Sequence, residues 1–443
     1  MTAQGISRHP IRGQCLAPGR AAEVGVHTGG YSRLFPDLPA LEVDATLLHA
    51  LGRRGAVCDG GDACDGDLSR VEAGWPHFGQ LVAHDITADR SPLDHVPGVL
   101  LDNYRTPKLN LECVYGAGPV GSPYLFDRED GATFLLGPGG HDVPRNGQGT
   151  ALLGDPRNDV HLFVNQLHLA LLKAHNAVVG ALRAEGEGED TVFDSARRTL
   201  VWHYQWVVVH DFLAGLVGPE MVAEVLATPP EARLATEPTI PFEFAGAAYR
   251  YGHAQVRQSY RINEGSGELS MFPDLIGFRP VGPERAIDWG LLFDMPGREP
   301  AQRAGRIDGR LPPALIRLPH EVTGDVPDPD YTSLASRDLQ RGRATGLPSG
   351  EAVARALGET PLTSAQVALP GWEGETPLYL YIMREAEALH GGDRLGPVGG
   401  RIVAEVLIAI LDGDAGSCRA SPGWVPVLPS GAGRPAGCGV TEG

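Results

Sequence analysis

The chain has 443 residues and carries 37 Lys and Arg against 55 Asp and Glu, for a formal net charge of −18. This charge excludes a generally basic nucleic-acid-binding protein and discourages binding to anionic membranes. A hydrophobic share of 42% is enough for a packed core, and the lack of any apolar run of about 18 residues predicts no membrane span.

Residues 1–30 are expected to form an irregular arm. They contain no apolar stretch of the kind that a secretory signal needs, so a cytoplasmic protein is the default expectation, with export by another route left open. Further on, Cys58 and Cys64 lie in a polar loop rich in Gly and Asp. A local disulfide, a metal site and two unrelated thiols all fit that loop.

Apolar residues that recur every three or four positions predict helices. The 59 glycines and 37 prolines indicate many loops between these helices. The sequence predicts a mainly α fold with very little β: a single large domain over 31–415, with long irregular loops, and a Gly/Pro-rich tail over 416–443. The expected helices cover 69–85, 155–183, 194–216, 244–261, 377–390 and 398–411, and residues 90–150 and 264–350 are expected to be loop-rich.

Three segments carry possible chemistry. In FGQLVAHDIT, His84 is followed by Asp85, which suits a general base beside an acidic ligand or a structural pair at a helix end. In GDPRND, Arg157 stands in the first turn of a helix, where the helix dipole disfavours a cation. An anionic or oxygen ligand would explain it, and so would a surface ion pair with Asp155 or Asp159. In YRYGH, Arg250 lies one turn before His253, a pair that suits a haem iron and its propionate or, alternatively, a helical core. His161, His168 and His175 recur every seven residues, about 10.5 Å of helix, which is too far apart for one ion, and are interpreted as structural.

Taken together, these segments resemble the animal-type haem peroxidase superfamily, in particular its bacterial members. The resemblance runs in order from about Leu34 to Leu411 through LFPDLP, FGQLVAHDIT, RTPKLNLECVYGAGP, GDPRND, QLHLALLKAHN, YRYGHAQVRQSYR and LGPVGGRIVAEVL. It implies that haem b is the cofactor.

The resemblance also implies roles for individual residues. His84 is similar to the distal histidine that moves a proton of hydrogen peroxide, Arg157 to the distal arginine, and Gln80 to the distal glutamine. On the other side, His253 is similar to the proximal iron ligand and Arg250 to a propionate partner. An acceptor for the second nitrogen of the proximal histidine is also implied, and the alignment puts Glu351 there.

A calcium site is the last feature that the resemblance implies. Its ligands would be Asp85 and alternate residues of the loop that follows the distal helix, all through oxygen, as calcium requires. The loop ligands are Thr106, Lys108, Asn110 and Glu112. Asn110 stands where a carboxylate is usual and Glu112 where a shorter side chain is usual, and a polar loop without metal is the alternative.

Two departures from the family pattern are informative. Mammalian-type members bind haem through two ester bonds, but the matching positions here are Ala83 and Val160, so haem is expected to be non-covalent. The branch that oxygenates fatty acids uses a Tyr three residues before the proximal histidine, and this chain has Arg250 there.

The resemblance therefore predicts an oxidoreductase, a peroxidase that reduces hydrogen peroxide through a ferryl species and oxidises a small donor. The donor is expected to be a halide, a pseudohalide such as thiocyanate, or a phenolic compound, with iodide, bromide or an aromatic compound preferred to chloride. A role in the response to oxidative stress is also expected. One alternative is an oxygenase or dioxygenase that modifies a specific metabolite or lipid. Another is a non-catalytic protein that keeps the fold for interaction.

Overall fold

The computed structural model describes residues 30–61, 66–88, 103–326 and 328–428. Within these ranges the chain is mainly helical, with two small antiparallel sheets, in agreement with the predicted fold class. The expected arm at 1–30, apart from residue 30, and Cys64 lie outside the described residues. Cys58 is buried, and burial raises the pKa of its thiol to about 12.

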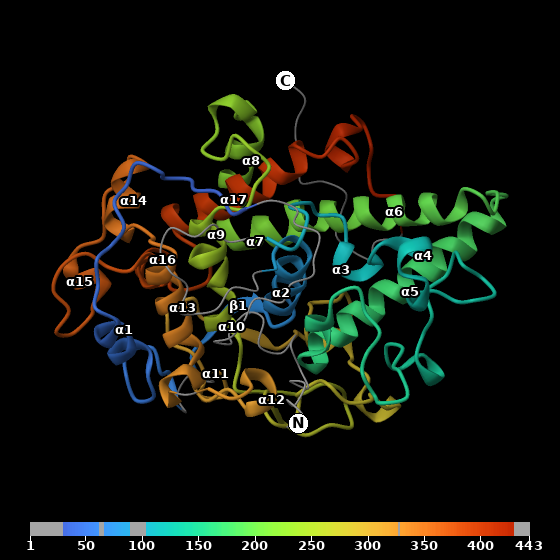
Figure 1. Cartoon of the computed structure of the whole chain (residues 1–443), viewed down its shortest axis with the longest axis horizontal. Helices are drawn as coiled ribbons and strands as arrows, with labels where there is room; N and C mark the ends of the chain where they lie inside the picture. The colour runs from blue at the N-terminus through green and yellow to red at the C-terminus, as the bar shows by residue number, and fades with distance from the viewer. Residues whose placement is uncertain (1–29, 62–65, 89–102, 327, 429–443) are drawn as a thin grey trace, which may run out of the picture.

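The longer helices form the frame of the molecule, and α2 lies near its centre (Figure 1). They are α2 (Trp75–Ile86), α5 (Leu162–Ala184), α6 (Val192–Val207), α8 (Pro219–Ala227), α13 (Leu334–Ala344), α16 (Leu378–His390) and α17 (Pro397–Asp412). A π-helical segment, η5 (Val208–Leu213), joins α6 to α7 (Ala214–Val217), so the predicted helix over 194–216 is confirmed as one continuous helical run.

Short helices and strands fill the connections. The short α-helices are α1 (Ala45–Gly52), α3 (Glu112–Tyr115), α4 (Gly118–Gly121), α9 (Phe242–Gly246), α10 (Gly252–Gln255), α11 (Pro313–Ile316), α12 (His320–Thr323), α14 (Gly350–Ala356) and α15 (Ser364–Val367). The 3₁₀ turns are η2 (Pro123–Leu125), η3 (Pro138–Gly140), η4 (Pro156–Asp159), η6 (Pro230–Ala232), η7 (Ala248–Arg250), η8 (Pro283–Arg285), η9 (Trp289–Leu291), η10 (Pro329–Thr332) and η11 (Cys418–Ala420). The strands are β1 (Leu68–Glu72), β2 (Ser259–Tyr260), β3 (Leu269–Ser270) and β4 (Arg303–Gly305), paired β1 with β4 and β2 with β3.

The main core surrounds α16 and α17. Both helices were predicted within one or two residues of their ends, because nearly every residue of α17 and the first nine of α16 are buried. Helix α16 begins after Pro377 without a side-chain cap, and the hydroxyl of the preceding Thr376 binds Glu351. Aliphatic side chains from these helices join those of α2, α5 and η5 in one cluster.

Three predicted helices begin or end differently. Residues 68–72 form strand β1, because they pair with β4 in a contact that no local pattern reveals, and helix α2 starts only at Trp75. The predicted helix over 155–183 divides into η4 and α5, because Gly277 and Phe278 donate backbone hydrogen bonds to the carbonyls of Val160 and Asp159. The predicted helix over 244–261 is three short pieces, α9, η7 and α10, followed by β2.

Helix α13 and the end of the described chain also depart from the sequence expectation. α13 lies inside the stretch 264–350 that was expected to be loop-rich, and its buried residues include Arg337, Asp338 and Arg341. In the tail, Trp424 packs against Trp202 and His203 of α6, so the described tail residues lie on the helical frame. No helix in the described part of the chain is long and apolar enough to cross a membrane.

Candidate functional site

The predicted distal histidine lies in the last turn of α2. His84 is 8% exposed, and its Nδ1 lies 2.8 Å from Oδ1 of Asn158, an atom that can only accept. This contact assigns the proton to Nδ1 and leaves Nε2 unprotonated, without a hydrogen bond to any described residue. Burial, and then the charge of Arg157, lower the pKa of His84 to about 3, so the imidazole is a neutral base.

A second histidine holds the amide that orients His84. The Asn158 Nδ2 donates to Nδ1 of His168 at 3.0 Å, so the orientation of this amide is determined at both ends. His168 is buried on α5. The interpretation of His168 as structural is confirmed, and through Asn158 this histidine also helps to orient His84.

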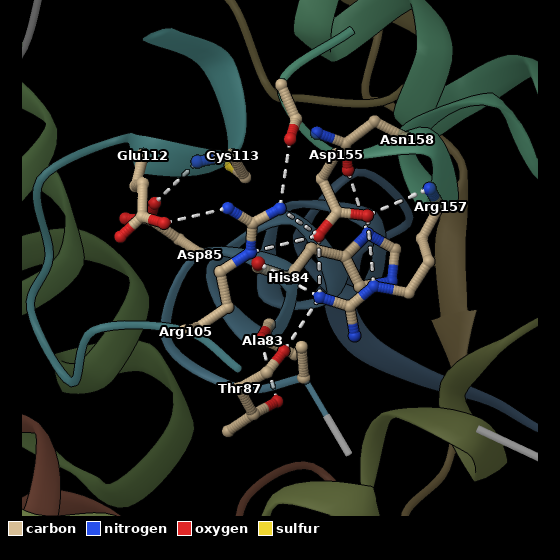
Figure 2. Close-up of polar contacts among 12 residues, drawn as sticks. Ala83, His84, Asp85, Thr87, Arg105, Glu112, Cys113, Asp155, Arg157 and Asn158 are labelled. Atoms are coloured by element: carbon tan, nitrogen blue, oxygen red, sulfur yellow. Dashed lines mark hydrogen bonds and ion pairs between the residues drawn. The ribbon is translucent and has the colours of Figure 1, made fainter. Parts of the chain in front are cut away.

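Arg157 is fastened to the same turn of α2 (Figure 2). It lies in η4, which Asp155 caps by accepting the Arg157 backbone N–H at 2.9 Å. Asp155 also receives the guanidinium, from Nε at 3.1 Å and from Nη2 at 2.8 Å. The same Nη2 donates to the carbonyls of His84 and Thr87 at 3.1 and 2.7 Å. The negative charge of Asp155 thus compensates the positive charge of Arg157, which the helix dipole alone would disfavour.

Gln80 lies one turn before His84 and is held by His161. The His161 Nδ1 caps α5 by accepting the N–H of Val164, so its Nε2 carries the proton and donates it to Oε1 of Gln80 at 2.6 Å. This bond leaves the Gln80 Nε2, a donor, without a hydrogen bond to any residue that the structure describes. His161, interpreted from sequence as structural, is the cap of α5 and also the orienting partner of Gln80.

On the proximal side, His253 lies in α10, and its partner is Asp338 of α13. The His253 Nδ1 lies 2.6 Å from one carboxylate oxygen of Asp338, and Arg250 Nη1 donates to the other at 2.7 Å. Asp338 is fully buried, which by itself raises a carboxyl pKa, but His253 and Arg250 hold the pKa of Asp338 below its ordinary value. The carboxylate is therefore charged and orients the imidazole.

Glu351 is not that partner, and this sequence prediction is wrong. Its carboxylate accepts from the backbone N–H and the hydroxyl of Thr376, at 2.8 and 2.7 Å, and so joins α14 to the segment before α16. Sequence reasoning missed Asp338 because α13 has no apolar stripe to mark it as a buried helix. The role of Arg250 toward a propionate stays a prediction. In the structure its guanidinium binds Asp338 and, through Nε, the carbonyl of Ala245.

The residues predicted to bind calcium have other partners. Both oxygens of Asp85 accept backbone N–H groups, from Leu111 at 2.9 Å and Cys113 at 3.2 Å. The Asn110 Oδ1 accepts the N–H of Glu112, and the Thr106 carbonyl accepts the N–H of Lys108. Arg105 donates to Glu112 Oε1 at 3.1 Å. The guanidinium of Arg105 is thus paired with the carboxylate that a calcium ion would need. The oxygens predicted to bind calcium therefore do not fit the metal.

Both histidines that would face a haem keep one ring nitrogen for a ligand. His84 and His253 come from α2 and α10, which pack against each other, and each histidine is anchored through Nδ1 by an oxygen. Each Nε2 therefore remains for a ligand. The His253 side chain is 30% exposed although Tyr251, Ala254 and Gln255 around it are buried, so its ring is accessible to a ligand.

Residues 126–368 match the family model described as "Animal haem peroxidase". This range contains Arg157, His253 and Asp338, and it begins after His84 and the 106–112 loop. Among curated proteins, chorion peroxidase of Drosophila melanogaster is 28% identical over 44% of this chain and 25% of its own length. Thyroid peroxidase of Canis lupus familiaris is 28% identical over 61% of this chain and 31% of its own length. The chain spans a quarter to about half of the length of the curated relatives it matches.

Solved structures share the fold over nearly the whole chain. Peroxidase A from Dictyostelium discoideum superposes with a TM-score of 0.63 at 15% identity, over 91% of both chains. The fatty acid alpha-dioxygenase of Oryza sativa also gives 0.63, at 14% identity, over 92% of this chain and 79% of its own. At these identities the likeness concerns the fold alone.

Proposed function

Because this chain belongs to the animal haem peroxidase family, we propose that it is a haem-dependent peroxidase, which reduces hydrogen peroxide and oxidises a small donor. The observation that carries the proposal is the pair of imidazoles, each anchored at Nδ1 with Nε2 left available. When bound, haem supplies the redox-active iron that exchanges electrons with peroxide and donor.

The distal residues suit peroxide chemistry. Nε2 of His84 is neutral and unprotonated, so it can accept a proton from hydrogen peroxide and return it to the departing oxygen. Arg157 is fixed beside it and supplies positive charge where negative charge develops. Gln80, oriented by His161, presents an N–H donor that can position a water molecule or the peroxide.

The proximal residues suit an electron-rich iron ligand. His253 would ligate iron through Nε2, and the charged Asp338 draws the Nδ1 proton toward itself. A ligand with this imidazolate character stabilises ferric iron and assists cleavage of the O–O bond. No ester bond can form at Ala83 or Val160, so we propose non-covalent haem b and, as donor, iodide, bromide or a phenol rather than chloride.

An oxygenase that acts on one lipid or metabolite is the second candidate. The structural likeness to fatty acid alpha-dioxygenases favours it at the level of the fold. Arg250 argues against an oxygenase, because it stands at the position where the fatty-acid-oxygenating branch has its radical-forming Tyr. Its guanidinium is paired with Asp338.

An absorption experiment tests the proposal. The haem-loaded protein should change its Soret band with one equivalent of hydrogen peroxide and return to the starting spectrum when iodide or guaiacol is added. His84→Gln should slow the first change about 10²–10⁴-fold, because the proton acceptor is lost. His175→Gln is the matched control, since His175 is equally buried but binds Tyr115 and the Ala132 carbonyl instead.

Two results would contradict the proposal. If hydrogen peroxide leaves the absorption spectrum of the haem-loaded protein unchanged, the assignment of His84 as the proton acceptor is wrong. Oxygenated product from a fatty acid, without consumption of iodide or guaiacol, would establish the oxygenase instead.

A further inference from the structure

The loop between α2 and α3 contains a positive charge of its own. Arg105 is 11% exposed, and all three of its guanidinium nitrogens donate to oxygens of the loop or of the segment before η4. Nη1 binds Glu112 at 3.1 Å, Nε and Nη2 bind one oxygen of Asp155 at 3.1 and 2.5 Å, and Nη2 also binds the Gly154 carbonyl at 3.0 Å. Figure 2 shows this guanidinium lying between Glu112 and Asp155.

Asp155 connects this cation to the distal site. Its carboxylate is 3% exposed and is shared by Arg105 and Arg157, so each guanidinium compensates part of one buried negative charge. Arg157 in turn holds the carbonyls of His84 and Thr87. A continuous series of charged contacts therefore runs from Glu112 through Arg105, Asp155 and Arg157 to the last turn of α2.

We infer that Arg105 is the built-in cation of this loop in place of a bound calcium ion, and that it positions Arg157 through Asp155. A guanidinium is planar and permanently charged, and it binds carboxylates through several directed N–H bonds. It does what a divalent cation would do here, which is to neutralise the loop carboxylate and tie the loop to the distal site. Unlike an ion, it cannot be removed by a chelator.

A calcium ion in addition to Arg105 is disfavoured for two reasons. The oxygens it would need on Asp85 and Asn110 already accept backbone N–H groups, and Glu112 is paired with Arg105. A divalent ion among these residues would also lie close to the Arg105 guanidinium, and two cations repel strongly where little water screens them.

The first test is made on the wild-type protein and needs no activity. Full-length protein purified without chelator should contain far less than one calcium per chain by elemental analysis. Neither EDTA nor added calcium chloride should shift its Tm by more than about 1 °C, because a ligand that does not bind the native state does not stabilise it. One calcium per chain, with a fall in Tm on EDTA treatment, would overturn the inference.

The second test uses variants of Arg105. Arg105→Gln leaves Glu112 unpaired and breaks the buried ion pair with Asp155. It should lower Tm by about 4–6 °C, as breaking a buried ion pair does in a chain of this size. Arg105→Lys keeps the positive charge but not the planar guanidinium, so its Tm should fall by less than that of Arg105→Gln. An unchanged Tm in both variants would contradict the inference.

A matched control separates positioning of Arg157 from general stability. Arg233 is also a buried arginine that binds one carboxylate, Asp412, and two backbone carbonyls, away from α2. Arg233→Gln should lower Tm similarly. With haem bound, only Arg105→Gln should slow cyanide binding, several-fold, because uptake of hydrogen cyanide needs the distal base in place. Equal cyanide rates in the two variants would show that Arg105 stabilises the fold without positioning Arg157.

Discussion

Both candidate haem-facing histidines are oriented by a side-chain oxygen at Nδ1, but the two oxygens differ in charge. His84 meets the neutral amide of Asn158, and His253 meets the buried carboxylate of Asp338. An amide keeps the imidazole neutral and basic at Nε2, which suits proton transfer. A carboxylate increases the electron density of the ring, which suits a metal ligand. The two partners thus give the same side chain two different chemistries.

The identity of the proximal partner is directly testable. Asp338→Ala should weaken haem binding about 10–100-fold, and Asp338→Asn should raise the reduction potential of the bound haem, because the imidazole loses its anionic partner. Haem titration and spectroelectrochemistry measure these effects. Glu351→Gln is the control and should change neither quantity, since that carboxylate binds Thr376. A similar effect of both substitutions would contradict the assignment.

Helix α13 carries Asp338 in a buried face made largely of polar side chains. Ser333 caps the helix, and Gln340 donates to the Ala45 carbonyl at the start of α1, which packs against α13. Hydrogen bonds to neighbouring elements thus satisfy part of a face that apolar packing covers in an ordinary helix. Such a helix can be buried in the interior without an apolar stripe in its sequence.

The N-terminus of α17 is capped from another helix. Glu385 of α16 is 3% exposed and accepts the backbone N–H groups of Val398 and Gly399. Burial is the largest influence on this group, and it raises the pKa of Glu385 to about 7. The folded protein therefore holds this proton more tightly than the unfolded chain does. The contribution of Glu385 to stability is fully present below about pH 4.5 and is lost as the pH rises through about 7.

Glu385→Gln should remove this pH dependence. At pH 8 the variant should exceed the wild type in free energy of unfolding by about 3 kcal/mol, because the amide has no charge to desolvate. At pH 5 the two proteins should nearly coincide. Denaturant unfolding at both pH values measures this. Glu385→Ala, which loses the cap, should be less stable than Glu385→Gln at both values by about 1 kcal/mol.

At the scale of the whole molecule, the candidate site is assembled from segments that are far apart in the chain. α2, η4, α10 and α13 supply His84, Arg157, His253 and Asp338 in turn. Both η4 and α10 pack against α2, and α13 packs against α16. A haem held between α2 and α10 would therefore connect parts of the fold that the chain itself does not keep together.

Haem removal should show this connection. Acidified organic solvent should extract the haem completely, because Ala83 and Val160 cannot form ester bonds. The haem-free protein should have a lower Tm than the haem-loaded protein. Added haem at about one hundred times its Kd should raise that Tm by about 3 °C. Absorption of the solvent phase and calorimetry measure both. Haem that stays with the protein would indicate a covalent bond, and an unchanged Tm would contradict the connecting role.

Much of the frame could be predicted from the sequence, while the candidate site residues were singled out by the family resemblance. The apolar periodicity of α2, α5, α6, α16 and α17 is local, because burial of a helix face must be encoded in the spacing of its own residues. Strand β1 could not be predicted in this way, since its stability comes from a partner more than 200 positions away.

The pairings were decided only by the tertiary structure. Whether Asp338 or Glu351 binds His253, and whether Arg105 or a metal ion neutralises Glu112, depends on which side chains folding brings within about 3 Å. Asp338 and Glu351 are both carboxylates, so residue type alone does not distinguish them as partners of His253. Hydrogen bonds and ion pairs need contact within about 3 Å, and the spacing of residues in a sequence does not fix positions that closely. The residue types for the chemistry are therefore present in the sequence, and the partner of each one is determined by three-dimensional packing.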